Sequence, residues 1–154
     1  MQLRNTINLN SVYIDSTSQS KTAVLLKISQ LLCHGSPELN AQALFDAYWK
    51  RESLGSTAIG QGITIPHVRA AGIKEPRSCV IRLLNPVDFG AVDKQPVDLV
   101  IGLLVPQEQA DQHLQILAAI IKQFSDSSFR DACRRMADNR ELYNLLVGES
   151  SELA

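Results

Sequence analysis

The sequence predicts a single α/β domain, residues 1–154, with helices on both faces of a β-sheet. An almost continuous apolar run, Val97 to Val105, is bracketed by prolines and is typical of a central strand covered on both sides. Segments with helical apolar spacing alternate with short β-branched runs along the chain. The 154 residues are 45% hydrophobic and 20% charged, which is enough for one ordinary core, and no repeat or linker divides them.

Five helices are predicted from apolar positions that recur at helical spacing. We expect them at about 21–33, from Ser36-Pro37 to about Arg51, and at about 110–124, 127–137 and 140–147. In the second helix, Ser36 is the expected N-cap and Pro37 the first helical residue. In the helix at 110–124, five side chains are expected to face the core: Leu114, Leu117, Ile120, Ile121 and Phe124.

Strands are predicted where β-branched and apolar residues lie between turn-forming residues. We expect them at Val12–Ile14, Ile63–Ile65, Cys79–Leu84 and Val97–Val105, with an irregular one near Val87. The polar segment from Val68 to Arg77 is predicted to be a loop. The C-terminal sequence GESSELA is expected to be mobile.

The composition argues against several classes of protein. A formal net charge of −1 offers no basic surface for nucleic acid, and the longest apolar run is too short to enter a membrane as a spanning helix. The N-terminus lacks the apolar segment of a signal peptide. The three cysteines, Cys33, Cys79 and Cys133, are scattered and odd in number, as expected for buried free thiols. We therefore expect a cytoplasmic protein, whose oligomeric state the sequence leaves open.

The stretch Gly60-Gln61-Gly62-Ile63-Thr64-Ile65-Pro66-His67 is the strongest candidate for a functional site. The two glycines permit a tight bend or a close backbone approach. Pro66 holds its own φ and pushes Ile65 toward extended geometry, so that a rigid strand end presents His67. Imidazole is largely neutral at cytosolic pH and can act as a nucleophile.

His113 is the second candidate, because it lies near the start of the helix that follows the most buried strand. In α/β sheets, ligands collect at strand ends, where helix N-termini favour anions. The two imidazoles could together bind a phosphoryl group, although a histidine on a helix is also a common core residue. Zinc would require three or four ligands, so no metal is expected. No nucleotide-binding or serine-hydrolase motif is present, and no cofactor is predicted.

The run from Arg51 to His67, RESLGSTAIGQGITIPH, resembles the active-site signature of phosphotransferase-system (PTS) EIIA proteins of the mannitol/fructose type. Within that family it is most similar to the nitrogen-regulatory branch, EIIA-Ntr. The resemblance extends over about residues 10 to 148. It also includes the segments Phe89–Leu99, Leu103–Pro106, His113-Leu114 with Leu117, and Glu141–Tyr143.

The resemblance implies a mixed β-sheet flanked by helices, with His67 as the phosphorylated residue. It also implies that His113 and Arg51 help to hold the phosphoryl group, with backbone donors near Ser56 and Thr57. The implied donor is an HPr-like phosphocarrier (NPr), and the implied output is binding to regulatory target proteins. Val68 departs from the family pattern, which has a small residue after the histidine.

Two other functions compete with this interpretation. A sugar-specific EIIA would pass the phosphoryl group to an EIIB, but no EIIB or membrane domain accompanies the signature here, which favours regulation. A metal-assisted hydrolase using His67 and His113 belongs to a different class. Gain of acid-labile phosphate from a PTS donor would distinguish a phosphocarrier from a hydrolase.

Overall fold

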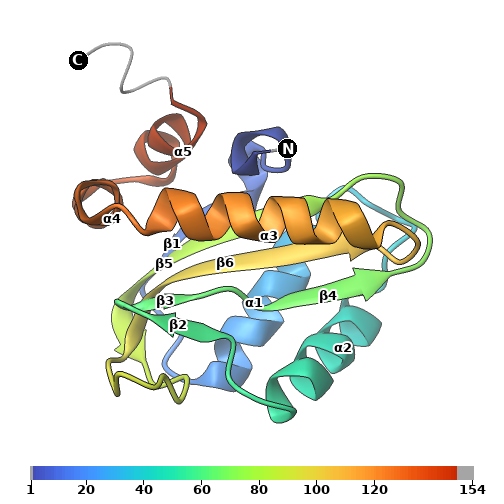
Figure 1. Cartoon of the computed structure of the whole chain (residues 1–154), viewed down its shortest axis with the longest axis horizontal. Coiled ribbons are helices and arrows are strands. Elements are labelled where there is room, and N and C mark those ends of the chain that lie inside the picture. Colours follow the sequence, from blue (N-terminus) through green and yellow to red (C-terminus); the bar gives the residue numbers. More distant parts are fainter. Residues whose placement is uncertain (1, 149–154) are drawn as a thin grey trace.

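The computed structural model describes residues 2–148, so residues 149–154 of the expected mobile tail lie outside it. A mixed sheet separates two layers of helices (Figure 1). The first layer contains α1 (Lys21–Cys33) and α2 (Ala41–Ser53), and the second contains α3 (Ala110–Phe124), α4 (Ser127–Arg135) and α5 (Asn139–Val147). Two short 3₁₀ helices, Leu3–Asn5 and Leu9–Ser11, precede the first strand. The predicted α/β fold with helices on both faces is confirmed.

The six-stranded sheet is organised around its most buried strand, β6. Its strands are β1 (Val12–Asp15), β2 (Ala58–Gly60), β3 (Ile63–Thr64), β4 (His67–Ala70), β5 (Arg77–Val87) and β6 (Val97–Pro106). On one side, β6 pairs antiparallel with β5, which in turn pairs parallel with β1. On the other side, β3 and β4 both pair parallel with β6, and β2 pairs antiparallel with β3. The sheet is therefore mixed, as the resemblance implied.

The apolar run of β6 supplies both halves of the core. Leu99, Ile101 and Leu103 are fully buried in the cluster beneath α3 and α5. Val100 and Leu104 point to the opposite face and are buried beneath α1 and α2. Because successive side chains of a strand point to opposite faces, a strand covered twice needs apolar residues at every position. The prediction of a central, doubly covered strand is confirmed.

The predicted start of the second helix at Ser36-Pro37 was wrong. The helix begins at Ala41, and the Asn40 side chain accepts a hydrogen bond from Ala43 N at 2.9 Å. Asn and Ser are comparable N-cap residues, so sequence alone could not rank the two positions. The Ser36 hydroxyl instead accepts from the guanidinium of Arg77, a residue 41 positions along the chain. The Ser36 side chain is thus used in a tertiary contact and not as a helix cap.

The predicted inward face of α3 was partly wrong. Ile116, Ile120 and Phe124 are the buried residues of this helix, whereas Leu114 is 65% exposed and Ile121 41% exposed. Residues four apart lie on one stripe of a helix, but Leu114 precedes Ile116 by two positions, more than half a turn. Several apolar positions around α3 therefore fit a helical pattern, and only packing on the sheet selects the buried stripe.

The loop predicted from Val68 to Arg77 is only partly correct: residues 71–76 lie outside the strands, but residues 68–70 do not. His67–Ala70 forms β4, in which His67 lies opposite Leu103 and Ala70 opposite Pro106. Strand β6 is long enough to pair with β3 through its first half and with β4 through its second. Between the two pairings stands Pro66, which has no N–H to donate but accepts from Leu103 N at 2.8 Å. A polar edge strand of this kind carries little local signal.

The bend at Gly60-Gln61-Gly62 is held in place by residues far away in the sequence. All three have positive φ, at 91°, 60° and 78°. Arg134 of α4 donates to Gln61 O at 2.7 Å and forms a bidentate ion pair with Asp98 of β6, both N–O distances being 2.8 Å. A Cβ on Gly62 would lie 2.6 Å from Arg134 Nη2 and 2.7 Å from Asp98 Oδ1.

Gly62→Ala should therefore destabilise the protein more than Gly72→Ala. Gly72 also has a positive φ, 87°, but apart from its chain neighbours no atom lies within 4 Å of the place that a Cβ would take. Each substitution costs roughly 1–2 kcal/mol for the left-handed backbone. Gly62→Ala should cost about 1–3 kcal/mol more, because it also displaces the Arg134–Asp98 pair. Urea denaturation measures the free energy of unfolding of both variants. Equal values would show that the Arg134–Asp98 pair can move aside without cost.

Candidate functional site

His67 lies at the start of edge strand β4, not at the end of a strand as its sequence context suggested. The imidazole is half-buried, and its Nδ1 is 2.7 Å from the carbonyl oxygen of Ile65. Because a carbonyl oxygen can only accept, Nδ1 carries the hydrogen in this pair. In the neutral ring the lone pair is therefore on Nε2.

His113 lies in the first turn of α3, directly beside His67. The two ring centroids are 5.4 Å apart, with the planes at 74°, an edge-to-face arrangement. Strand β4 and the start of α3 come together because the connection after β6 is short and returns α3 over the sheet (Figure 1). The structure thus brings together the two histidines that the sequence singled out.

Arg69 is a residue of the site that sequence reasoning missed. Its Nε donates to His113 Nδ1 at 3.3 Å. His67 and Arg69 are two positions apart on β4, so both side chains point to the face covered by α3. The sequence predicts a loop after His67, and a loop has no such alternation. Had the strand been predicted, the period of two would have placed Arg69 beside His67.

The surroundings of His113 favour its neutral form. Burial lowers the pKa of His113 most, and the neighbouring His67 and the positive charge of Arg69 lower this pKa further. Since Nδ1 accepts from Arg69, the hydrogen of the neutral ring is on Nε2. The folded protein is therefore more stable above the pKa that His113 has in the unfolded chain. This stability is lost as the pH falls through the lower pKa that His113 has in the folded protein.

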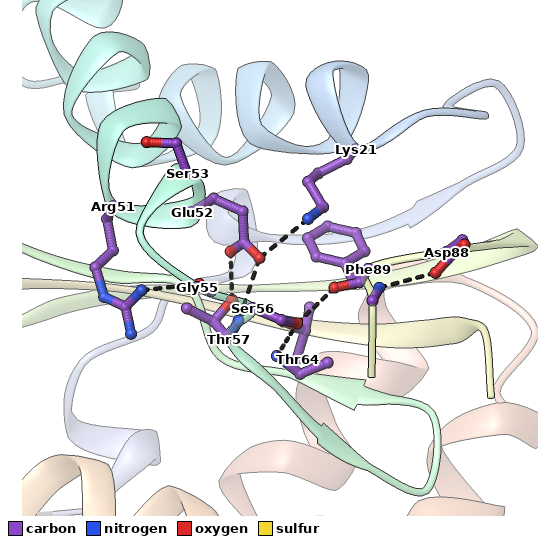
Figure 2. Close-up of polar contacts among 12 residues, drawn as sticks. Lys21, Arg51, Glu52, Ser53, Gly55, Ser56, Thr57, Thr64, Asp88 and Phe89 are labelled. Carbon is purple, nitrogen blue, oxygen red and sulfur yellow. Dashed lines mark hydrogen bonds and ion pairs between the residues drawn. The ribbon is translucent and has the colours of Figure 1, made fainter. Parts of the chain in front are cut away.

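Arg51 lies in the last turn of α2, and Ser56 lies in the segment that connects α2 to β2 (Figure 2). Arg51 Nη1 donates to the carbonyl oxygen of Gly55 at 3.0 Å. The Ser56 hydroxyl donates to the carbonyl oxygen of Phe89 and accepts from Ala58 N at 3.1 Å. These bonds order the connection. The predicted contribution of Arg51 and Ser56 to phosphoryl binding stays a prediction.

Thr57 is buried and is bound through both of its donors. Its hydroxyl donates to Glu52 Oε1 at 2.6 Å, and its backbone N–H donates to Glu52 Oε2 at 3.2 Å. Its carbonyl oxygen accepts from Ile65 N at 3.1 Å. Thr57 therefore links the α2–β2 connection to the segment that precedes His67, and its expected role at the phosphoryl group likewise stays a prediction.

Val68, the departure from the family pattern, points away from the histidines. It is 9% exposed and packs in the core cluster beneath α1 and α2. Its extra volume is accommodated by the core.

Within residues 2–148, no three His, Cys, Asp or Glu side chains are grouped so that they could hold a metal ion. None of the helices described over that range is long and apolar enough to span a bilayer.

Comparison with known proteins identifies the family. Residues 5–148 match the family described as phosphoenolpyruvate-dependent sugar phosphotransferase system, EIIA 2. The chain belongs to this family. This EIIA protein is therefore a PTS component, and the resemblance seen in the sequence is confirmed.

Several relatives carry a regulatory name. The EIIA protein is 41% identical over 128 residues to the nitrogen regulatory protein of Pseudomonas aeruginosa, covering 83% of each chain. The crystal structure of nitrogen regulatory protein IIA-Ntr from Neisseria meningitidis superposes with a TM-score of 0.84 at 33% identity, covering 93% of this chain and 97% of that one. A PTS fructose-specific EIIA component of Haloferax volcanii is 34% identical over 105 residues, 68% of each chain.

Removing the charge of Arg69 should raise the pKa of His113. In Arg69→Gln the positive neighbour is lost, while the burial that lowers this pKa most is retained. An NMR pH titration of the histidine ring protons measures the change. Arg140→Gln, which removes an exposed arginine of α5, is the matched control and should leave the titration unchanged. An unchanged or lower pKa in Arg69→Gln would show that Arg69 does not act on His113.

Proposed function

We propose that this EIIA protein is a regulatory phosphocarrier, which accepts a phosphoryl group on Nε2 of His67 from an HPr-like phosphohistidine protein (NPr). The observation that carries the proposal is the 2.7 Å contact between His67 Nδ1 and Ile65 O, which leaves the lone pair on Nε2. The ring is half-buried, and a second imidazole lies against it.

In this reaction the Nε2 lone pair of His67 attacks the phosphorus atom of the donor's phosphohistidine in line. A new N–P bond forms as the donor's N–P bond breaks, and the donor nitrogen retains the electron pair of the broken bond. Nδ1 keeps its hydrogen, which stays hydrogen-bonded to Ile65 O throughout. The positive charge that this leaves on the ring is offset by the adjacent phosphoryl oxygens. Positioning and electrostatics then supply the catalysis.

The proposed role of His113 is to donate its Nε2 hydrogen to a phosphoryl oxygen. Arg69 supports this role because it holds His113 Nδ1 as an acceptor. Arg51 and the backbone near Ser56 and Thr57 are proposed to add donors once the phosphoryl group is present. Arginine, imidazole and backbone N–H groups can together balance the phosphoryl charge, so no metal is required.

The proposed output is phosphorylation-dependent binding to regulatory target proteins in the cytoplasm. A phosphoryl group adds roughly −1.5 to −2 charge, enough to change which partner a surface accepts. The nitrogen-regulatory relatives support this output. The second candidate is a sugar-specific EIIA that passes its phosphoryl group to an EIIB, and the fructose-specific relative supports it.

His67 should be the only residue that is phosphorylated. With phosphoenolpyruvate, enzyme I and an HPr-type carrier, the wild-type protein should gain one acid-labile phosphoryl group, located by mass spectrometry. His67→Ala should gain none, because it lacks the nucleophile. Label that persists in folded His67→Ala would refute the assignment.

The same assay tests the competing functions. Transfer from a purified, metal-free donor should survive a chelator. Loss of this step, with recovery on addition of zinc, would favour the metal-assisted hydrolase. Adding candidate EIIB proteins to the phosphorylated protein distinguishes the sugar-specific alternative, because a regulatory phosphocarrier should transfer to none of them.

His113→Ala should slow phosphorylation of His67 without abolishing it. A donor aimed at developing charge commonly contributes on the order of 10²-fold or more to a rate. His113→Gln keeps a neutral donor and should fall between wild type and alanine. Single-turnover kinetics with an HPr-like donor measures all three. Equal rates in folded proteins would mean that His113 only packs its helix.

A further inference from the structure

We propose that Glu52 is a positioning residue for His67, acting through Thr57 and Ile65, with Lys21 as its counter-ion. The inference rests on the proposed function of His67 as the phosphoryl acceptor. Glu52 is in the last turn of α2 and contacts neither histidine directly; it acts through a chain of hydrogen bonds.

The Glu52 carboxylate is buried and satisfied on both oxygens (Figure 2). Its side chain is 3% exposed, and Oε2 lies 3.2 Å from Lys21 Nζ of α1. Oε1 accepts from the Thr57 hydroxyl at 2.6 Å, and Oε2 also accepts from Thr57 N at 3.2 Å. Replacing a buried ion pair by apolar side chains often costs nothing. A buried carboxylate with this many specific partners is therefore better explained by the geometry that it imposes.

The donor in each bond follows from chemistry. A carboxylate can only accept, so the Thr57 hydroxyl hydrogen is committed to Glu52. The buried Thr64 hydroxyl, 2.9 Å from Thr57 Oγ1, must then be the donor in that contact. Glu52 thus orients Thr57, and Thr57 in turn orients the side chain of Thr64 on β3.

The chain of bonds continues through the backbone to the imidazole. The carbonyl oxygen of Thr57 accepts from Ile65 N at 3.1 Å. The carbonyl oxygen of Ile65 accepts from His67 Nδ1 at 2.7 Å. Thr57 thus donates its N–H to Glu52 and accepts from Ile65 N, and Ile65 accepts from His67 Nδ1. The orientation of each peptide group in this series therefore constrains the next one. Glu52 stands at one end of this series and His67 at the other.

Neighbouring contacts hold the same connection from its other side. Lys21 Nζ, the counter-ion of Glu52, also lies 5.3 Å from the centroid of the Phe89 ring. The carbonyl oxygen of Phe89 accepts from the Ser56 hydroxyl (Figure 2). The α2–β2 connection is therefore fixed on one side by Glu52 and on the other by Phe89, with Lys21 contacting both.

The consequence for His67 is control of its tautomer. While Ile65 O faces Nδ1, the hydrogen stays on Nδ1 and the nucleophilic lone pair stays on Nε2. If Thr57 loses its anchor, the Ile65 peptide is less constrained and the Nε2–H tautomer becomes populated. That tautomer has no lone pair on Nε2 and cannot accept a phosphoryl group there.

The test compares Glu52→Gln with wild type by two measurements. Glutamine keeps the shape, but loses the charge opposite Lys21 and directs an N–H₂ group at a Thr57 donor. Long-range ¹H–¹⁵N NMR of the unphosphorylated protein reports the His67 tautomer, and single-turnover transfer from an HPr-type donor reports the rate. Glu38→Gln is the matched control, since Glu38 forms an ion pair with Arg77 at 2.6 Å on the exposed surface.

Wild type and Glu38→Gln should show the Nδ1–H form of His67. In Glu52→Gln the two ring-nitrogen shifts of His67 should move toward each other, and transfer should slow roughly 10- to 100-fold, as expected for a displaced reacting group. Thr57→Val, which keeps the backbone bonds, should fall between. If Glu52→Gln does not fold, the His67 ring-nitrogen shifts of Thr57→Val and Lys21→Met test the proposal in its place.

A folded Glu52→Gln with the wild-type tautomer signature would overturn the proposal, even if its stability were lower, because Glu52 would then be purely structural. Failure of the proposed function is a separate result. If wild type gains no phosphoryl group from any HPr-type donor, His67 is not a phosphoryl acceptor, and the NMR comparison still decides whether Glu52 controls its tautomer.

Discussion

The pairing of two short strands with one side of β6 is the constraint on which the site depends. Strands β3 and β4 are successive segments of one extended path, and Pro66 interrupts that path because it cannot donate to the ladder. At this break, the backbone from Ile65 to His67 is held by β6 on one side, where Leu103 N donates to Pro66 O. The carbonyl oxygen of Ile65, the residue before the proline, accepts from the imidazole of His67.

The chemistry of the two imidazoles is set by hydrogen-bond direction. Each histidine has one nitrogen assigned by a partner: Ile65 O accepts from His67, and Arg69 donates to His113. The first ring therefore keeps a lone pair on Nε2, and the second keeps a hydrogen there. Burial and the nearby positive charge lower the pKa of His113, which favours this complementary state. The proposed phosphoryl transfer to His67 would use both, the lone pair as nucleophile and the hydrogen as donor.

The connection between α2 and β2 gives the site its support. Glu52, buried at the end of α2, accepts two hydrogen bonds from Thr57 of this segment and forms an ion pair with Lys21 of α1. The Arg134–Asp98 pair does the same for the bend at Gly60–Gly62 from the opposite helical layer. In both places one member of an ion pair also hydrogen-bonds a backbone group of a loop: Glu52 accepts from the buried Thr57 N, and Arg134 donates to Gln61 O.

The sequence by itself determined the fold class, the central strand at Val97–Val105, and the prominence of His67 and His113. These features rest on local physics: apolar periodicity, proline and glycine geometry, and the chemistry of imidazole. The tertiary structure alone decided that β4 is a strand, that Arg69 joins the site, that α2 begins after Asn40, and which stripe of α3 is buried. Each of these depends on a partner distant in the chain. An edge strand forms only when its neighbour is present, and a cap or buried stripe is chosen among local equivalents by packing.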